Sequence, residues 1–184
     1  MTLRVLLTGF GPFGEVVSNP TERLVAHFGG LVLPTSFERA PRLLFERMFD
    51  HDVVLMLGVA ESSEEFRVER LGRNVDDARI VDVDGAQPKG VIVADGPETL
   101  SATIDVERVR DAIERVGQRS SLSASAGAYV CNRVLYSVLH RLQGTNTRAG
   151  FLHVPADSET HRAARTERRF DGLISAVEAA LSAL

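Results

Sequence analysis

The chain has 184 residues, of which 44% are hydrophobic and 25% are charged, so a globular fold with a sizeable core is expected and disorder is not. The net charge of −4 and the isoelectric point near 5.7 argue against a protein that binds nucleic acid or a membrane surface, because either partner requires a basic face. We predict a single domain over residues 1–184.

The cysteine content and the apolar runs point to a compartment. Cys131 is the only cysteine, so no internal disulfide can form and a reducing compartment fits. The first apolar run, at residues 5–7, is too short for a signal peptide, and no run reaches the length of a membrane span. A cytoplasmic protein is the expectation.

Strand-like and helix-like patterns alternate along the chain. In chain order they predict a strand at 3–8, a helix at 20–28, a strand at 31–33, a helix at 42–49, strands at 52–59, 66–71 and 78–83, a loop at 85–96, helices at 105–116 and 132–142, a strand at 149–154 and a helix at 173–184. This alternation indicates an α/β fold, namely a three-layer α/β/α sandwich around a mostly parallel, twisted sheet. The basic stretch 161–169 is expected to form a solvated helix face.

A glycine-rich loop follows the first strand. Gly9, Gly11 and Gly14 fit the dinucleotide-binding pattern G-x-G-x-x-G, but that function requires a helix that starts within the motif. Here the helix start is the N-cap Asn19 with Pro20, several residues later, and the second strand lacks the terminal acid that would hold a ribose. The pattern favours a tight turn that carries two phenylalanines, at positions 10 and 13.

Cys131 is a candidate nucleophile because it lies at or near the start of a predicted helix. Backbone N–H groups and the helix dipole favour a thiolate there, and the same N–H groups can stabilise an oxyanion. The alternative is an inert, buried cysteine that acts as a small apolar residue.

His153 is the best of five candidate bases. It comes late in an apolar strand, and the carboxyl ends of parallel strands line ligand crevices; the alternative is a core histidine with satisfied hydrogen bonds. His140 is out of phase with Cys131 on the same helix and should face away, and no close spacing of two ligands suggests a metal site. A serine hydrolase is poorly supported because G-x-S-x-G is absent.

Four segments, in order, resemble pyroglutamyl peptidase I, the family of pyrrolidone-carboxylate cysteine peptidases. They are LLTGFGPFG at 6–14 with Asn19-Pro20, VERLGRNVDDARI at 68–80 with GAQP at 85–88, SASAGAYVCN at 123–132, and GFLHVP at 150–155. Each motif is weak alone, but the four together span most of the chain and are specific.

The resemblance implies a cysteine exopeptidase that removes N-terminal pyroglutamate from peptides through a Cys-His-Glu triad, without cofactor or metal. The triad falls on Cys131, His153 and Glu69, although the residues alone do not single out Glu69 among 25 acids. The implied substrate-binding residues are Phe10, Phe13, Asn19, Ile80, Tyr129 and Val130, and Arg79 with the Cys131 N–H is placed near the oxyanion. The resemblance also implies homo-oligomers, dimers or tetramers.

The chain also departs from the family pattern. It is trimmed around the second strand and after His153, where residues 156–159 replace the usual aromatic and Pro-Glu-Gln, and residues 61–67 differ before Glu69. These changes leave open an alternative, a catalytically weak or inactive relative that binds a lactam or a peptide N-terminus without cleaving it.

Overall fold

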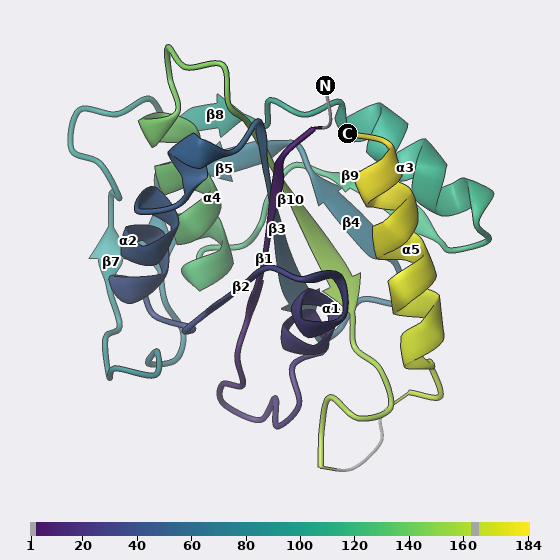
Figure 1. The fold of residues 1–184 in the computed structure, drawn as a ribbon. Helices are drawn as coiled ribbons and strands as arrows, with labels where there is room; N and C mark the ends of the chain where they lie inside the picture. Colours follow the sequence, from purple (N-terminus) through teal and green to yellow (C-terminus); the bar gives the residue numbers. More distant parts are fainter. Residues whose placement is uncertain (1–2, 163–165) are drawn as a thin grey trace.

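The computed structural model describes residues 3–162 and 166–184, and strands alternate with helices along it (Figure 1). The strands are β1 (Val5–Phe10), β2 (Leu31–Leu33), β3 (Val53–Ala60), β4 (Phe66–Glu69), β5 (Leu71–Arg73), β6 (Asp76–Asp77), β7 (Lys89–Gly90), β8 (Thr99–Ser101), β9 (Ser120–Ser123) and β10 (Arg148–Pro155). The helices are α1 (Pro20–Phe28), α2 (Arg39–Phe45), the 3₁₀ turn η1 (Met48–Asp50), α3 (Val106–Arg115), α4 (Val130–Arg141) and α5 (Phe170–Ser182).

A mixed sheet with the strand order β2-β1-β3-β10-β4-β9 forms the centre of the described chain. All neighbouring strands in it are parallel except β10 and β4, which pair antiparallel. The prediction of a mostly parallel sheet is therefore confirmed, and the reversal of β4 was not foreseen. Two small ladders, β5 with β8 and β6 with β7, lie outside this sheet.

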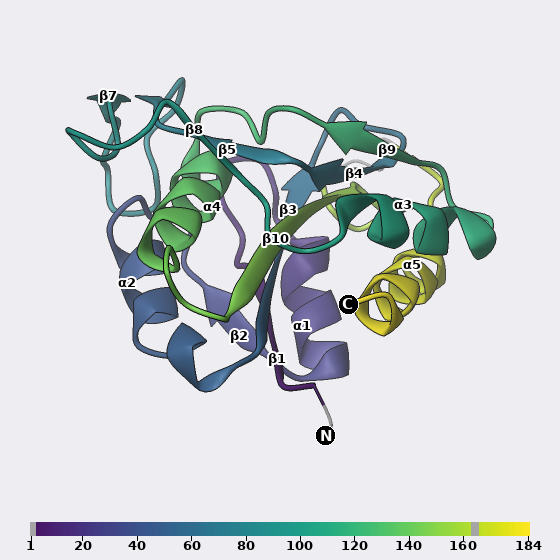
Figure 2. The same cartoon turned by 90° about the horizontal axis from the view of Figure 1, so that it is seen from above.

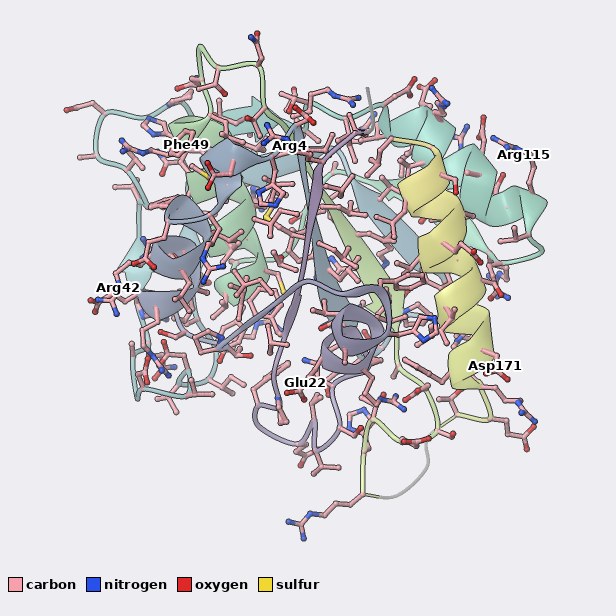
Figure 3. All side chains as sticks on the ribbon, in the orientation of Figure 1. Arg4, Glu22, Arg42, Phe49, Arg115 and Asp171 are labelled. Atoms are coloured by element: carbon pink, nitrogen blue, oxygen red, sulfur yellow. The ribbon has the colours of Figure 1, made fainter. Side chains whose placement is uncertain are left out.

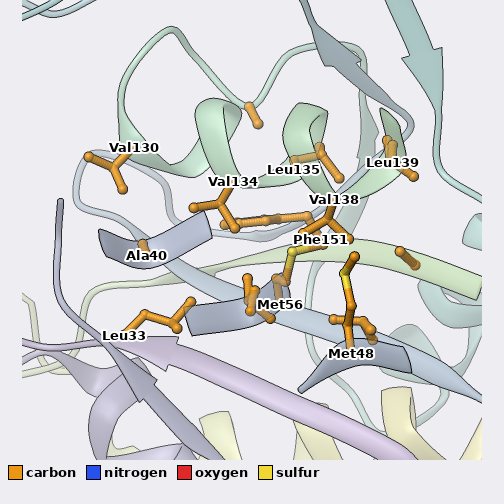
Figure 4. Packing of buried hydrophobic residues seen from close by; sticks show 14 of the residues in the cluster. Leu33, Ala40, Met48, Met56, Val130, Val134, Leu135, Val138, Leu139 and Phe151 are labelled. Atoms are coloured by element: carbon orange, nitrogen blue, oxygen red, sulfur yellow. The ribbon is translucent and has the colours of Figure 1, made fainter. Parts of the chain in front are cut away.

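Helices cover both faces of the sheet, which gives the predicted three layers (Figure 2). Successive residues of β3 alternate between the two cores because side chains of a strand point to opposite faces. Met56 packs with α2 and α4 in one core, where Figure 4 shows it near Phe151, while Leu55 and Leu57 pack with α1, α3 and α5 in the other. Charged side chains such as Arg42, Arg115 and Asp171 lie at the periphery (Figure 3).

The glycine-rich loop and α1 adopt the arrangement that the sequence predicts. Asn19 caps α1, since its side chain accepts a hydrogen bond from the Thr21 N–H, and Pro20 is the first helical residue. Gly14 has a φ of 52°, which favours glycine, whereas Gly9 is required by space: a Cβ there would lie 2.4 Å from the carbonyl oxygen of Thr21. The helix thus starts after the glycines, whereas in a dinucleotide site it starts within the glycine motif.

Several predicted elements differ from the structure. Residues 78–83 do not form a strand; Ile80, Val81 and Val83 are exposed, and neighbouring backbone groups bond to loops instead. The short strands β8 and β9 were missed because they carry few apolar residues. Of the basic stretch, 163–165 lie outside the described residues and 166–169 are not helical, while His161 is buried rather than solvated.

Candidate active site

Strand register brings Glu69 and His153 together. Glu69 pairs with Phe151 and Arg67 pairs with His153 across the antiparallel β4–β10 ladder, so Glu69 and His153 project diagonally from the same face. The Glu69 Oε1 atom lies 2.8 Å from the His153 Nδ1 atom, and the Glu69 side chain is fully buried. This bond directs Nδ1 at the carboxylate and leaves Nε2 for another partner.

Cys131 reaches the same point from α4. It is the second residue of that helix, directly after Val130, so its backbone N–H lies in the first turn, where N–H groups have no partner within the helix. The Cys131 Sγ atom lies against β3, because a Cβ added to Gly58 would be 3.0 Å from it. Gly58 pairs with His153 in the β3–β10 register, and the side chains of Cys131 and His153 are hydrogen bonded.

The environment of His153 favours its charged form. Burial lowers the pKa of the imidazole, but hydrogen bonds and charge interactions with Cys131 and Glu69 outweigh that effect and raise the pKa from 6.5 to about 9. An imidazolium is therefore favoured at neutral pH. An imidazolium beside a cysteine stabilises the thiolate, which is the nucleophilic form of sulfur.

The glycine-rich loop is fixed from within by polar contacts. The Asn19 Nδ2 atom donates to the carbonyl of Gly11 over 3.0 Å, and the Phe10 N–H donates to the Thr21 hydroxyl over 2.9 Å. The Phe10 side chain is only 2% exposed and belongs to the core on the α4 side of the sheet, whereas Phe13 is partly exposed at the turn.

Tyr129 and Phe13 form an aromatic group next to Cys131. Their ring centroids lie 6.1 Å apart, and Phe37 meets Tyr129 edge-on at 5.2 Å. The Tyr129 hydroxyl donates to the carbonyl of Val81, and burial raises its pKa to about 12. A Cβ on Gly14 would lie 3.8 Å from Ile80 Cδ1, so Ile80 borders the same loop.

The other residues expected at the site have different surroundings. Val130 is fully buried in the core, and Arg79 is exposed. Sequence reasoning missed Phe37 and Asn132. The buried Asn132 amide donates to the carbonyls of Arg73 and Val75, which ties the segment after Glu69 to the helix of the cysteine. Its position directly after Cys131 was the only available signal.

The segment after His153 supports the glycine-rich loop. The carbonyl of Thr160 accepts hydrogen bonds from the N–H groups of Val17 and Ser18, and the buried Asp157 side chain bonds both the Thr160 hydroxyl and Arg23 of α1. The segment that departs from the family pattern is therefore packed against the loop that carries Phe13.

A groove of about 540 Å³ lies between α2 and α4, and its lining includes neither Cys131 nor His153. Apolar side chains such as Pro41, Phe45 and Ile92 dominate it. The groove is therefore separate from the group formed by Glu69, His153 and Cys131. Over residues 3–162 and 166–184, no three potential metal ligands cluster, and no helix is long and apolar enough to cross a bilayer.

Comparison with known proteins agrees with this geometry. The sequence model of the family described as pyroglutamyl peptidase matches residues 3–182. Curated relatives include the pyrrolidone-carboxylate peptidases of Staphylococcus saprophyticus (39% identical over 168 residues, 83% of this chain and 78% of the relative) and Thermococcus litoralis (37% over 168 residues, 83% and 76%).

Solved structures give the same result. The pyrrolidone carboxyl peptidase from Thermococcus litoralis superposes with a TM-score of 0.92 at 32% identity, covering 99% of this chain and 93% of that one. The pyroglutamyl peptidase I from Bacillus amyloliquefaciens gives 0.92 at 27% identity, covering 100% and 95%. With a family match over almost its whole length, a buried Glu–His pair and a cysteine hydrogen bonded to that histidine, the chain belongs to the pyroglutamyl peptidase family.

Proposed function

We propose that this chain is a cysteine exopeptidase that releases pyroglutamate from the N-terminus of peptides, with Cys131, His153 and Glu69 as its catalytic residues. The observation that carries the proposal is the position of His153, whose side chain is hydrogen bonded to the carboxylate of Glu69 and to the Cys131 thiol. Family membership supplies the substrate class.

In the proposed mechanism the Cys131 thiolate attacks the carbonyl carbon that joins pyroglutamate to the next residue. The tetrahedral oxyanion is stabilised by the Cys131 N–H in the first turn of α4 and by Arg79. The imidazolium of His153 gives its proton to the leaving amine, and Glu69 holds the ring in the productive orientation.

Hydrolysis of the resulting thioester completes the cycle. His153, now neutral, accepts a proton from a water molecule as that water attacks the acyl carbon. The C–S bond breaks, free pyroglutamate leaves, and the thiolate and imidazolium are restored.

The specificity of the proposed site follows from the chemistry of the lactam. Pyroglutamate is a flat, uncharged ring, which suits a wall built from Phe13 and Tyr129 over a floor that contains Phe10. A free amino terminus would bring an unpaired charge into this apolar setting, which is unfavourable.

A second candidate, a relative that binds a peptide end without cleaving it, is motivated by the altered segments 61–67 and 156–159. A fluorogenic pyroglutamyl amide, incubated with the purified protein and with its Cys131→Ser variant, separates the two. We expect turnover by the wild type and its loss in the variant. Binding of the amide without release of the fluorophore by the wild type would favour the second candidate.

Labelling provides an independent check of the nucleophile. Iodoacetamide should inactivate the wild type with one label per chain, because Cys131 is the only thiol. Near-normal turnover by Cys131→Ser would overturn the mechanism.

A further inference from the structure

Gly58 lies on the sheet face against which the side chains of Phe151 and Cys131 pack. It lies in β3, opposite His153 in the register, and its φ is not in the left-handed region, so the backbone itself does not require glycine. Space is the requirement instead. A Cβ at Gly58 would lie 2.7 Å from Phe151 Cζ and 3.0 Å from Cys131 Sγ.

These distances are too short for an ordinary contact. Carbon atoms attract one another best at about 3.5–4.0 Å, and a glycine within a strand commonly marks such a close approach. An added methyl group must therefore displace the Phe151 ring, the thiol or the backbone of β3. The site contains little free space to absorb the change, because Phe151 is fully buried.

Displacement of either group reaches the reacting atoms. A displaced thiol would disturb the hydrogen bond that it shares with His153. The Phe151 ring would transmit the shift as well, since its centroid lies 4.8 Å from that of His153 and its backbone pairs with Glu69. The absence of a side chain at Gly58 thus fixes how closely sulfur and imidazole approach.

We propose that Gly58 is a positioning residue of the catalytic pair: the empty volume above it admits the Cys131 sulfur to within hydrogen-bonding distance of His153. This inference rests on the proposed function, and it adds a residue on β3 to a site built from β4, β10 and α4. Gly58 acts through its neighbours and need not touch the substrate.

The test is Gly58→Ala, with Gly150→Ala as a matched control. Gly150 lies on β10, next to β3, and a Cβ there would meet Ile104 at 2.1 Å in the opposite core, away from the thiol. Both variants crowd the sheet, but only Gly58→Ala crowds Cys131. We expect kcat for a pyroglutamyl amide to fall about 10²-fold in Gly58→Ala with little change in KM, and to stay near the wild-type value in folded Gly150→Ala.

Alkylation of Cys131 gives a second measurement that needs no substrate turnover. A thiolate held farther from the imidazolium is less stabilised, so less of the reactive form is present at low pH. The alkylation ratio, defined as the iodoacetamide rate at pH 6 divided by the rate at pH 9, should therefore fall in Gly58→Ala and not in Gly150→Ala. If the wild type fails to cleave the amide, the proposed function fails, but the alkylation ratio still decides the role of Gly58.

A double variant separates the thiol contact from general packing. Phe151→Leu removes the ring atoms nearest to Gly58. The double variant Gly58→Ala/Phe151→Leu should therefore regain melting temperature, while its kcat and its alkylation ratio stay low. The same double variant provides the kinetic measurement if Gly58→Ala alone does not fold. Wild-type kcat and alkylation ratio in folded Gly58→Ala would overturn the proposal. Recovery of kcat together with stability in the double variant would overturn it as well, by assigning the loss to the packing of Phe151.

Discussion

The Nδ1 atom of His153 lies 2.8 Å from Oε1 of Glu69, although 84 residues separate the two along the chain. The contact is set by the register between two antiparallel strands, β4 and β10. Both groups are buried, and the histidine has a further hydrogen bond to Cys131. The protonation state of His153 should therefore affect both the stability of the fold and catalysis.

Stability should depend on the protonation of His153. Its pKa is raised to about 9 in the folded chain from 6.5, so the folded state binds the proton more tightly than the unfolded state. The resulting stabilisation is fully present below about pH 6.5 and is lost as the pH rises through about 9. The melting temperature, measured by calorimetry, should fall between these values, and less steeply in His153→Gln. A wild-type melting temperature that is constant or rises over this window would contradict the shift.

The triad residues should act as a unit. His153→Ala should lower kcat by about 10³–10⁴-fold, and Glu69→Gln should cost less because the glutamate orients the ring without transferring a proton. The double variant should be little worse than His153→Ala in steady-state kinetics. His140→Ala is the control, since His140 stacks on Tyr136 and should leave turnover unchanged. Additive losses in the double variant would place the role of Glu69 elsewhere.

The two phenylalanines of the glycine-rich loop should give different phenotypes. Phe10 is buried, so Phe10→Ala should lower the free energy of unfolding by about 3–5 kcal/mol. Phe13 is partly exposed beside Tyr129, so Phe13→Ala should lower kcat/KM for pyroglutamyl substrates with a smaller loss of stability and near-normal alkylation of Cys131. Denaturant unfolding and kinetics on both variants test this. A large loss of stability with unchanged kinetics in Phe13→Ala would exclude Phe13 from the pocket wall.

The Asp157 side chain should influence substrate binding from a distance. Asp157→Ala removes its bonds to Thr160 and Arg23, which loosens the turn whose carbonyl holds the loop of Phe13, so KM should rise several-fold while Cys131 alkylation is unchanged. The free energy of unfolding should fall by no more than about 3–5 kcal/mol, because Arg23 keeps some access to solvent.

Glu159→Ala is the matched control for Asp157→Ala. Glu159 binds the same Arg23 but its side chain is 66% exposed, and exposed ion pairs contribute little. Both KM and stability should therefore stay close to wild type. Equal effects of the two variants on KM would show that the charge of Arg23, and not the turn, controls the loop.

Apolar patterning and helix caps predicted most of the fold. The N-cap at Asn19 and the apolar run of β3 depend on local chemistry, and both were placed within a residue or so. The reversal of β4 depends on long-range pairing, and β9 is too polar to stand out, so neither could be predicted. The last helix was predicted, and in the structure Leu173, Ala176 and Ala180 are buried on the face that it turns to the sheet.

The candidate site likewise contains residues that the sequence identifies and residues that only long-range pairing reveals. Cys131 and His153 could be selected from the sequence, because each has an uncommon side chain at an informative place, a helix start and a strand end. Glu69 could not be distinguished from the other acids, since its partner is defined by the strand register alone. Gly58 gave no signal, because what matters at that position is the side chain it lacks.

The strand pairing of Glu69 and His153 also limits which insertions and deletions the gene can tolerate. Adding or removing one residue inside β4 or β10 would turn the following side chains to the opposite face and separate the pair. Changes of length in the loops outside β4 and β10 would leave this register, and the contact between Glu69 and His153, intact. Selection on length should therefore be strict within these two strands and relaxed between them.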